Sequence, residues 1–252
     1  MSEGHVKSSI ENGIGSVTFY HPQSNSMPGR LLRKLAEEIT AMGKNPEAKL
    51  IVLRSEGEKA FCAGASFDEL ISIKDKETGD HFFSGFALVI NAMRTAPKFV
   101  IARVQGKAVG GGVGLASAAD YAIATEAAAV KLSELAVGIG PFVVGPAVER
   151  KIGNAAFTNL AINATEWRDA RWAMQHGLYA DIYPTISDLD AAVDALAKKL
   201  AGSNPEAMME LKQVAWQGTE HWNQLLSERA QISGRLVLSE FTINAINKFK
   251  GK

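Results

Sequence analysis

Apolar and polar residues alternate over two short stretches near the N-terminus. Val6 to Ile10 alternates loosely, the pattern breaks at Asn12-Gly13, and it resumes from Ile14 to Phe19. A period of two indicates a half-buried strand, and Asn-Gly between two such runs favours a turn with positive φ. The chain is therefore predicted to open with an antiparallel hairpin.

The next segment is apolar at helical spacing, from Leu31 to Met42. Pro28 suits the first turn of a helix, and Gly43 and Asn45 are residues at which helices end. Leu50 to Leu53 is then a short apolar run, which is typical of a buried strand. The first third of the chain reads as strand, strand, helix, strand.

The same order recurs further along. Phe99 to Val104 is an apolar run followed by a glycine-rich turn and a helical pattern, and Tyr121 to Ala124 predicts another short strand. Strands that alternate with helices favour an α/β fold with a largely buried sheet.

The strand pattern ends at about Asn154, and the remaining apolar periodicity is helical. Helices are predicted over residues 155–162, 166–176, 189–200, 205–216 and 219–238. Tyr183-Pro184-Thr185 reads as a turn, so we place a boundary there between a core, residues 1–184, and a helical region, residues 185–252. Helices too few to build their own core often complete it against another subunit.

Composition excludes several classes of protein. The 252 residues are 46% hydrophobic, enough for one substantial core, and Lys plus Arg equals Asp plus Glu at 27 each. That balance gives no net field to attract nucleic acid or an anionic membrane. Cys62 is the single cysteine, the five histidines lack ligand spacing, and Met1 to Val6 shows no signal-peptide pattern. We expect a cytoplasmic protein without a metal site.

Two glycine-marked turns are the strongest candidates for chemistry. Ala63-Gly64-Ala65 leads into a helix whose N-cap is Ser66, with Glu69 placed to complete a capping box. Val109-Gly110-Gly111-Gly112 enters an alanine-rich helix. Free N–H groups at helix N-termini suit a phosphate or a developing oxyanion, although the same glycines can serve close packing of helix on sheet.

Other motif interpretations fail on particular residues. The glycine run lacks Gly-Lys-Ser/Thr, which excludes a P-loop, and no strand predicted from the sequence ends in an acidic residue about twenty positions on, which argues against a dinucleotide fold. No Gly-x-Ser-x-Gly elbow is present. Cys62 has no histidine close in sequence, so it reads as a core residue rather than a nucleophile. The C-terminal aromatic residues lack the interleaved basic patches of a base-stacking platform, which disfavours RNA binding.

The ordered motifs of the chain resemble those of the crotonase (enoyl-CoA hydratase/isomerase) superfamily. The motifs that carry the resemblance, in order and spacing, are Ala63-Gly64-Ala65, Gln105 to Gly112, Ala119-Asp120-Tyr121, Leu132 to Leu135, Gly138 and Pro141. Pro22 to Met27 also resembles the family's loop near the CoA adenosine, and Trp167 to Asp181 resembles the helix, Gly-Leu and strand that lead into the family's terminal helices. The resemblance implies an α/β fold of the ClpP/crotonase type, a spiral of ββα units with a C-terminal helical trimerisation region. It also implies a homotrimer or a dimer of trimers.

The resemblance further implies an enzyme that binds an acyl-CoA thioester. The family grips the thioester oxygen with two backbone N–H groups, at positions that match Ala65 and Gly111. Contacts with coenzyme A are implied at Asn25, Lys59 and Ala63, although Lys59 reads equally well as a solvated lysine. Coenzyme A enters as part of the substrate, so no separate cofactor is expected.

The hydratases of the family carry two catalytic glutamates, and this chain has Gly114 at the first position and Glu134 at the second. Glu134 lies between Leu132 and Leu135, a context that raises a carboxyl pKa towards neutrality and suits a proton-transfer base. Hydration is naturally shared by two carboxylates, whereas moving a double bond needs one base, so the sequence leans towards isomerisation. A divergent 2-enoyl-CoA hydratase, including one for branched acyl chains, and a catalytically weak acyl-CoA-binding subunit remain open. Asp120 is expected to be structural.

Overall fold

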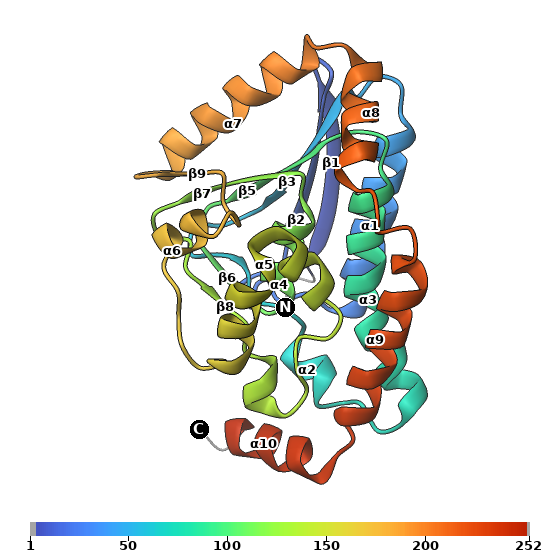
Figure 1. The fold of residues 1–252 in the computed structure, drawn as a ribbon. Helices are drawn as coiled ribbons and strands as arrows, with labels where there is room; N and C mark the ends of the chain where they lie inside the picture. Colours follow the sequence, from blue (N-terminus) through green and yellow to red (C-terminus); the bar gives the residue numbers. More distant parts are fainter. Residues whose placement is uncertain (1–3, 251–252) are drawn as a thin grey trace.

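The strands form two sheets in the computed structural model, which describes residues 4–250 (Figure 1). The six-stranded sheet has the order β1 (His5–Glu11), β2 (Ile14–Tyr20), β3 (Leu50–Ser55), β5 (Val100–Val104), β7 (Tyr121–Thr125) and β9 (Asp181–Tyr183). The smaller sheet has the order β4 (Ala60–Cys62), β6 (Lys107–Val109) and β8 (Val130–Lys131). All neighbouring strands except β1 and β2 are parallel.

The predicted N-terminal hairpin is confirmed. Strands β1 and β2 pair antiparallel, with Glu11 opposite Ile14, and the turn between them has positive φ at Asn12 (51°) and Gly13 (80°). Val17 and Phe19 of β2 are fully buried, which is the half-buried pattern that the alternation indicated.

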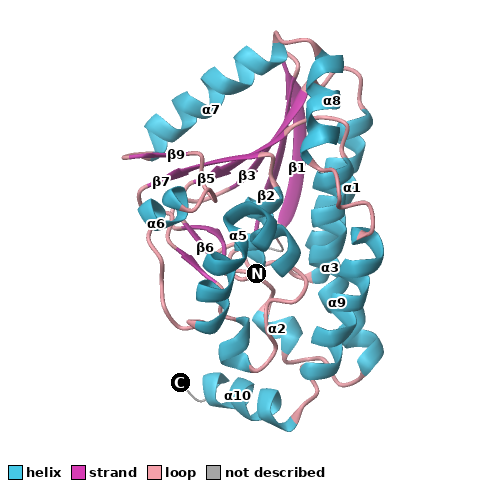
Figure 2. Ribbon diagram, in the orientation of Figure 1, coloured by secondary structure: helices cyan, strands magenta, loops and turns pink. Residues whose placement is uncertain are grey.

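Helices cover both faces of the large sheet (Figure 1). On one side α1 (Gly29–Lys44), α3 (Lys76–Thr95) and α9 (Trp222–Leu236) run together, and α7 (Ile186–Ala201) lies on the other. The remaining helices are α2 (Phe67–Leu70), α4 (Gly111–Ala118), the 3₁₀ turn η1 (Glu134–Val137), α5 (Gly145–Ile162), α6 (Ala170–Gln175), α8 (Pro205–Ala215) and α10 (Glu240–Lys250). Figure 2 shows that loops and turns connect these helices and strands to one another.

The structure corrects the C-terminal secondary structure predicted from the sequence. The apolar pattern alone predicted that strands end near Asn154, which is wrong, because β9 adds to the edge of the large sheet beside β7; the likeness over Trp167 to Asp181 did imply a strand here. With three residues, β9 is too short to show alternation. The helix predicted over residues 219–238 corresponds to α9, and a separate helix, α10, follows it. Earlier in the chain, the long helix α3 was not predicted from the sequence.

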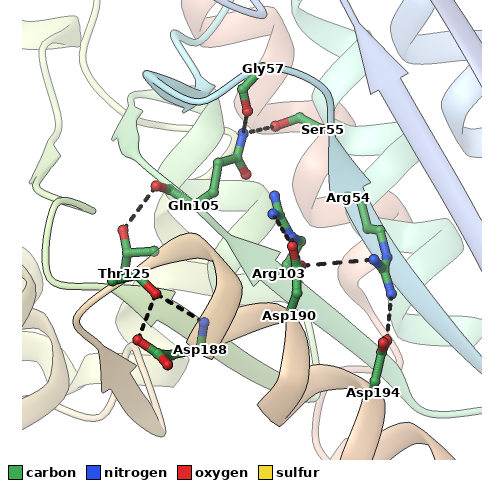
Figure 3. A network of polar contacts seen from close by, with 10 residues as sticks. Arg54, Ser55, Gly57, Arg103, Gln105, Thr125, Asp188, Asp190 and Asp194 are labelled. Atoms are coloured by element: carbon green, nitrogen blue, oxygen red, sulfur yellow. Dashed lines mark hydrogen bonds and ion pairs between the residues drawn. The ribbon is translucent and has the colours of Figure 1, made fainter.

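Helix α7 is fixed to the sheet by apolar contacts and by ion pairs that Arg54 and Arg103 form with two aspartates of the helix (Figure 3). Leu189 and Val193 pack against strands β3, β5 and β7. The nearly buried guanidinium of Arg103 on β5 donates to Asp190 through Nε at 2.5 Å and Nη2 at 2.9 Å, and Arg54 pairs with Asp194 at 3.2 Å. Residues after 184 therefore cover the core of their own chain, while the boundary at that residue stays a prediction.

Gln105 connects the two sheets (Figure 3). Its Nε2 donates to Ser55 Oγ at 2.8 Å, to the carbonyl oxygen of Gly57 at 3.1 Å and to that of Ala60 at 3.1 Å. The backbone carbonyl oxygen of Gln105 accepts the Thr125 hydroxyl at 2.9 Å. These bonds fix the start of β4 against β5, and thereby position the small sheet.

None of the helices among residues 4–250 is long and apolar enough to cross a membrane.

Candidate active site

The three strands of the small sheet are parallel, so their carboxyl ends meet at one edge. Ala63-Gly64-Ala65 follows β4, Gly110-Gly111 follows β6 and Ser133-Glu134 follows β8. The first two turns touch: a Cβ added to Gly64 would lie 3.0 Å from the carbonyl oxygen of Val109 and 3.6 Å from the nitrogen of Gly111. Segments up to 71 residues apart in sequence therefore form one site.

A cavity of about 210 Å³ opens at this edge. The three strand ends form one wall, and the opposite wall is almost entirely apolar. That wall comes from α2, α3, the segment from Val137 to Val144, and α9, which contribute Phe67, Leu70, Phe83, Phe86, Val137, Ile139, Gly140, Pro141, Phe142, Val143, Val144 and Ser233. An apolar cavity with a few converging polar groups is the usual form of a small-molecule site.

Two backbone N–H groups at the cavity are unpaired. Ala65 forms a parallel bridge with Met27, in which the Met27 N–H donates to Gly64 and the Ser66 N–H donates to Met27, leaving the Ala65 N–H outside the pairing. Gly111 is the first residue of α4, where an N–H has no acceptor within the helix. Within residues 4–250, neither N–H has a hydrogen-bond partner.

Glycine is required at Gly110 for two reasons. Its φ is +51° with ψ of −114°, a conformation that L side chains rarely adopt. A Cβ there would also lie 2.9 Å from Oε1 of Glu134. The carboxylate of Glu134 thus packs directly on the backbone of the glycine turn, next to the unpaired N–H of Gly111.

The predicted capping box at α2 is only half formed. Ser66 Oγ accepts the Glu69 N–H at 3.4 Å, as expected of an N-cap. The reciprocal bond is absent among the described residues, because the Ser66 N–H donates to Met27 and the Glu69 carboxylate accepts the Gly29 N–H at 2.6 Å. Glu69 therefore joins α2 to the start of α1 and holds the turn that carries Ala65.

Glu134 is the one ionisable side chain among the described residues that line the cavity. The residue as a whole is half-buried, but its Oε2 is inaccessible to solvent and has no hydrogen-bond partner among residues 4–250. Burial raises the pKa of Glu134 from 4.5 to about 7. The Thr242 hydroxyl of α10 donates to the Gly138 carbonyl at 3.2 Å, which holds the turn behind Glu134 in place.

No second carboxylate faces Glu134 among the described lining residues. Gly114 lies in α4, and a Cβ added to it would meet Val144 Cγ1 at 2.4 Å and Val144 Cβ at 2.7 Å. Val144 therefore fills the space into which a side chain at position 114 would project. A glutamate at 114 would require a smaller residue at 144 as well, a condition that the sequence does not reveal.

The three residues predicted to contact coenzyme A lie in different surroundings. Ala63 lines the cavity. Asn25 is buried, and its Nδ2 donates to the carbonyl oxygens of Glu56 at 2.8 Å and Ala60 at 3.0 Å. Lys59 is exposed and outside the cavity lining. Their contacts with coenzyme A stay predictions.

Asp120 has the structural position expected from the sequence. Its carboxylate accepts the Val100 N–H and the Trp216 indole N–H, each at 2.7 Å, and pairs with Lys212 at 2.8 Å.

Cys62 is buried, and burial raises the pKa of its thiol to about 12, as suits a core residue. The lining residues Phe83, Phe142 and Ser233 were missed, because no local pattern distinguishes them from core positions.

Comparison with known proteins agrees with this geometry. The model of the enoyl-CoA hydratase/isomerase family matches residues 9–242. The methylglutaconyl-CoA hydratase of Rattus norvegicus is 32% identical over 200 residues, which are 78% of this chain and 63% of that relative. The solved enoyl-CoA hydratase of Mycobacterium smegmatis is 27% identical, with a TM-score of 0.79 over 85% of this chain and 83% of that one.

A third comparison bears on the fold alone. The enoyl-CoA hydratase of Bacillus halodurans superposes with a TM-score of 0.89 over 96% of this chain and 99% of that one, at 22% identity. The chain has the crotonase fold, and it belongs to the enoyl-CoA hydratase/isomerase family of the crotonase superfamily.

Proposed function

We propose that this chain binds an acyl-CoA thioester and moves a proton between two carbons of its acyl group, with Glu134 as the base. The observation that carries the proposal is the buried, unpaired Oε2 of Glu134 in the same cavity as the two unpaired N–H groups of Ala65 and Gly111. The two donors suit the negative charge that forms on a thioester oxygen when a neighbouring carbon loses a proton.

The proposed reaction is the shift of a double bond from the 3- to the 2-position. Glu134 removes a proton from C2 of a 3-enoyl thioester, the electrons delocalise onto the thioester oxygen, and the same carboxyl returns the proton to C4. A carboxyl pKa of about 7 supports both steps, because acceptance and return are then nearly balanced at neutral pH.

Hydration of a 2-enoyl thioester is the second candidate. It is favoured by relatives that are named hydratases, including the Rattus norvegicus protein. The geometry favours isomerisation, because Val144 occupies the space beside Gly114 and leaves one carboxylate in the described lining. A third possibility, a subunit that binds acyl-CoA with weak catalysis, uses the same cavity.

Turnover of matched thioesters separates the three functions. We expect conversion of 3-hexenoyl-CoA to the 2-enoyl thioester, followed by absorbance of the conjugated product, to exceed hydration of 2-hexenoyl-CoA. Exchange of C2 protons in deuterated water should accompany it. Faster hydration would support the second candidate, and binding without turnover or exchange would support the third.

The proposal includes two further expectations. Asn25, Lys59 and Ala63 are proposed to lie along coenzyme A, which enters with the substrate. The assembly is proposed to be a homotrimer or a dimer of trimers. Light scattering that gave a monomer at micromolar concentration would contradict the proposed assembly.

Ala65→Pro should lower kcat about 100-fold and change acyl-CoA affinity much less. Proline removes the N–H at this position, and loss of one oxyanion donor costs about 3 kcal/mol of transition-state stabilisation. Steady-state kinetics and equilibrium binding would separate the two effects. Ala63→Pro is unsuitable as a control because the Ala63 N–H donates to Ser24, so Ala65→Ser is the matched variant, and it should retain activity.

A further inference from the structure

The cavity carries no cationic side chain among its described lining residues. Its polar groups are the carboxyl of Glu134, the hydroxyls of Ser133 and Ser233, and backbone groups of the three strand ends. Any ligand group that reaches the apolar wall therefore leaves water without gaining a positive partner from a side chain.

The two unpaired N–H groups are the positive features of the site. In the proposed reaction they are occupied, because Ala65 and Gly111 both donate to the thioester oxygen. An additional anionic group on the acyl chain would have to lie further along the cavity, against aromatic and aliphatic side chains such as Phe83, Phe86 and Phe142. The carboxylate of Glu134, when ionised, would also repel it.

The size of the cavity limits the acyl group as well. Its volume of about 210 Å³ lies below the ~300–1,000 Å³ of most small-molecule pockets. A short acyl chain, whose carbon atoms are each comparable in size to a water molecule, would fill it. A carboxylate at the end of such a chain would remain inside the cavity.

We propose that this site selects short, electrically neutral acyl groups and rejects acyl groups that carry a second carboxylate. The inference rests on the proposed function, since it assumes that the thioester oxygen lies at Ala65 and Gly111. An unpaired carboxylate in apolar surroundings is strongly disfavoured, so the discrimination should be large.

Binding of matched thioesters tests the inference without requiring turnover. Hexanoyl-CoA and the mono-CoA thioester of adipic acid have the same six-carbon chain and differ in the terminal carboxylate. Isothermal titration calorimetry at pH 7.5 should give at least about 100-fold weaker binding of the adipic thioester. Dissociation constants within about threefold of each other would overturn the inference.

A cation added to the apolar wall should reverse part of the discrimination. Phe142 is half-buried, so Phe142→Lys can place an ammonium at the cavity. We expect this variant to bind the adipic thioester at least about tenfold more tightly than the wild type, with no gain for hexanoyl-CoA. The control is Tyr121→Lys, at an exposed aromatic residue of β7 outside the cavity lining, which should keep the wild-type ratio.

Failure of this inference and failure of the proposed function give different results. Selective binding of the neutral thioester without turnover of any enoyl-CoA would support the acyl selectivity and reject the proposed reaction. Turnover of neutral and carboxylated 3-enoyl thioesters with equal kcat/KM would reject the selectivity and leave the proposed reaction intact.

Discussion

Glu134→Gln should lower kcat by about 100-fold to 10,000-fold, the range that a positioned acid-base group supplies. Glutamine has nearly the same shape as glutamate but cannot accept the proton. Acyl-CoA affinity should change little, since the N–H groups of Ala65 and Gly111 and the apolar wall are unaltered. Single-turnover kinetics with 3-hexenoyl-CoA measure the loss, and near-normal kcat would show that another group is the base.

The pH dependence provides an independent test of the same residue. The base must be ionised, so kcat of the wild type should rise with pH through about 7, the pKa to which burial raises Glu134. This ionisation should be absent from the residual rate of Glu134→Gln.

Protein stability should depend on the ionisation of Glu134 in the opposite direction to kcat, falling as pH rises. Its pKa is about 7 in the folded state and 4.5 when not buried, so between these values the folded chain binds more protons than the unfolded chain. The free energy of unfolding should therefore fall as pH rises from about 4.5 to about 7. Glu134→Gln should lack this decrease and be at least as stable as the wild type at pH 8, as urea titrations at several pH values would show.

Asp120→Ala should lower the free energy of unfolding by about 3–5 kcal/mol. The side chains of Lys212 and Asp120 are 3% and 9% exposed, and their ion pair joins α8 to the start of β7. Removing Asp120 leaves the Lys212 ammonium buried with carbonyl partners only, at Met93 and Lys98, and leaves the Trp216 indole N–H without its acceptor. Urea denaturation at pH 7 measures the change.

A double-mutant cycle distinguishes the ion pair from general damage to packing. Lys212→Met removes the charge and keeps most of the apolar stem. If the pair causes the loss, the double variant should cost at least about 1 kcal/mol less than the sum of the two single variants. Additive losses would mean that the two side chains stabilise the fold independently.

Local sequence patterns predicted the elements that are formed by local interactions or that have a strong apolar period. Alternation with Asn12-Gly13 between its two halves predicted the β1–β2 hairpin, and apolar residues at helical spacing predicted α1. The local patterns missed strand β9 and helix α3 for opposite reasons. β9 is three residues long, whereas α3 is buried on several sides and so lacks a narrow apolar stripe.

For the site, the sequence determined which groups are available. It placed glycine turns after two short strands, which freed the N–H groups of Ala65 and Gly111, and it put Glu134 between apolar neighbours. Only the tertiary structure brought these groups together, through the parallel pairing of β4, β6 and β8. It also decided that Val144 fills the space beside Gly114 and that Lys212 reaches Asp120. These contacts join residues 30 and 92 positions apart, and their geometry depends on how whole helices pack, which no local period of two or 3.6 residues records.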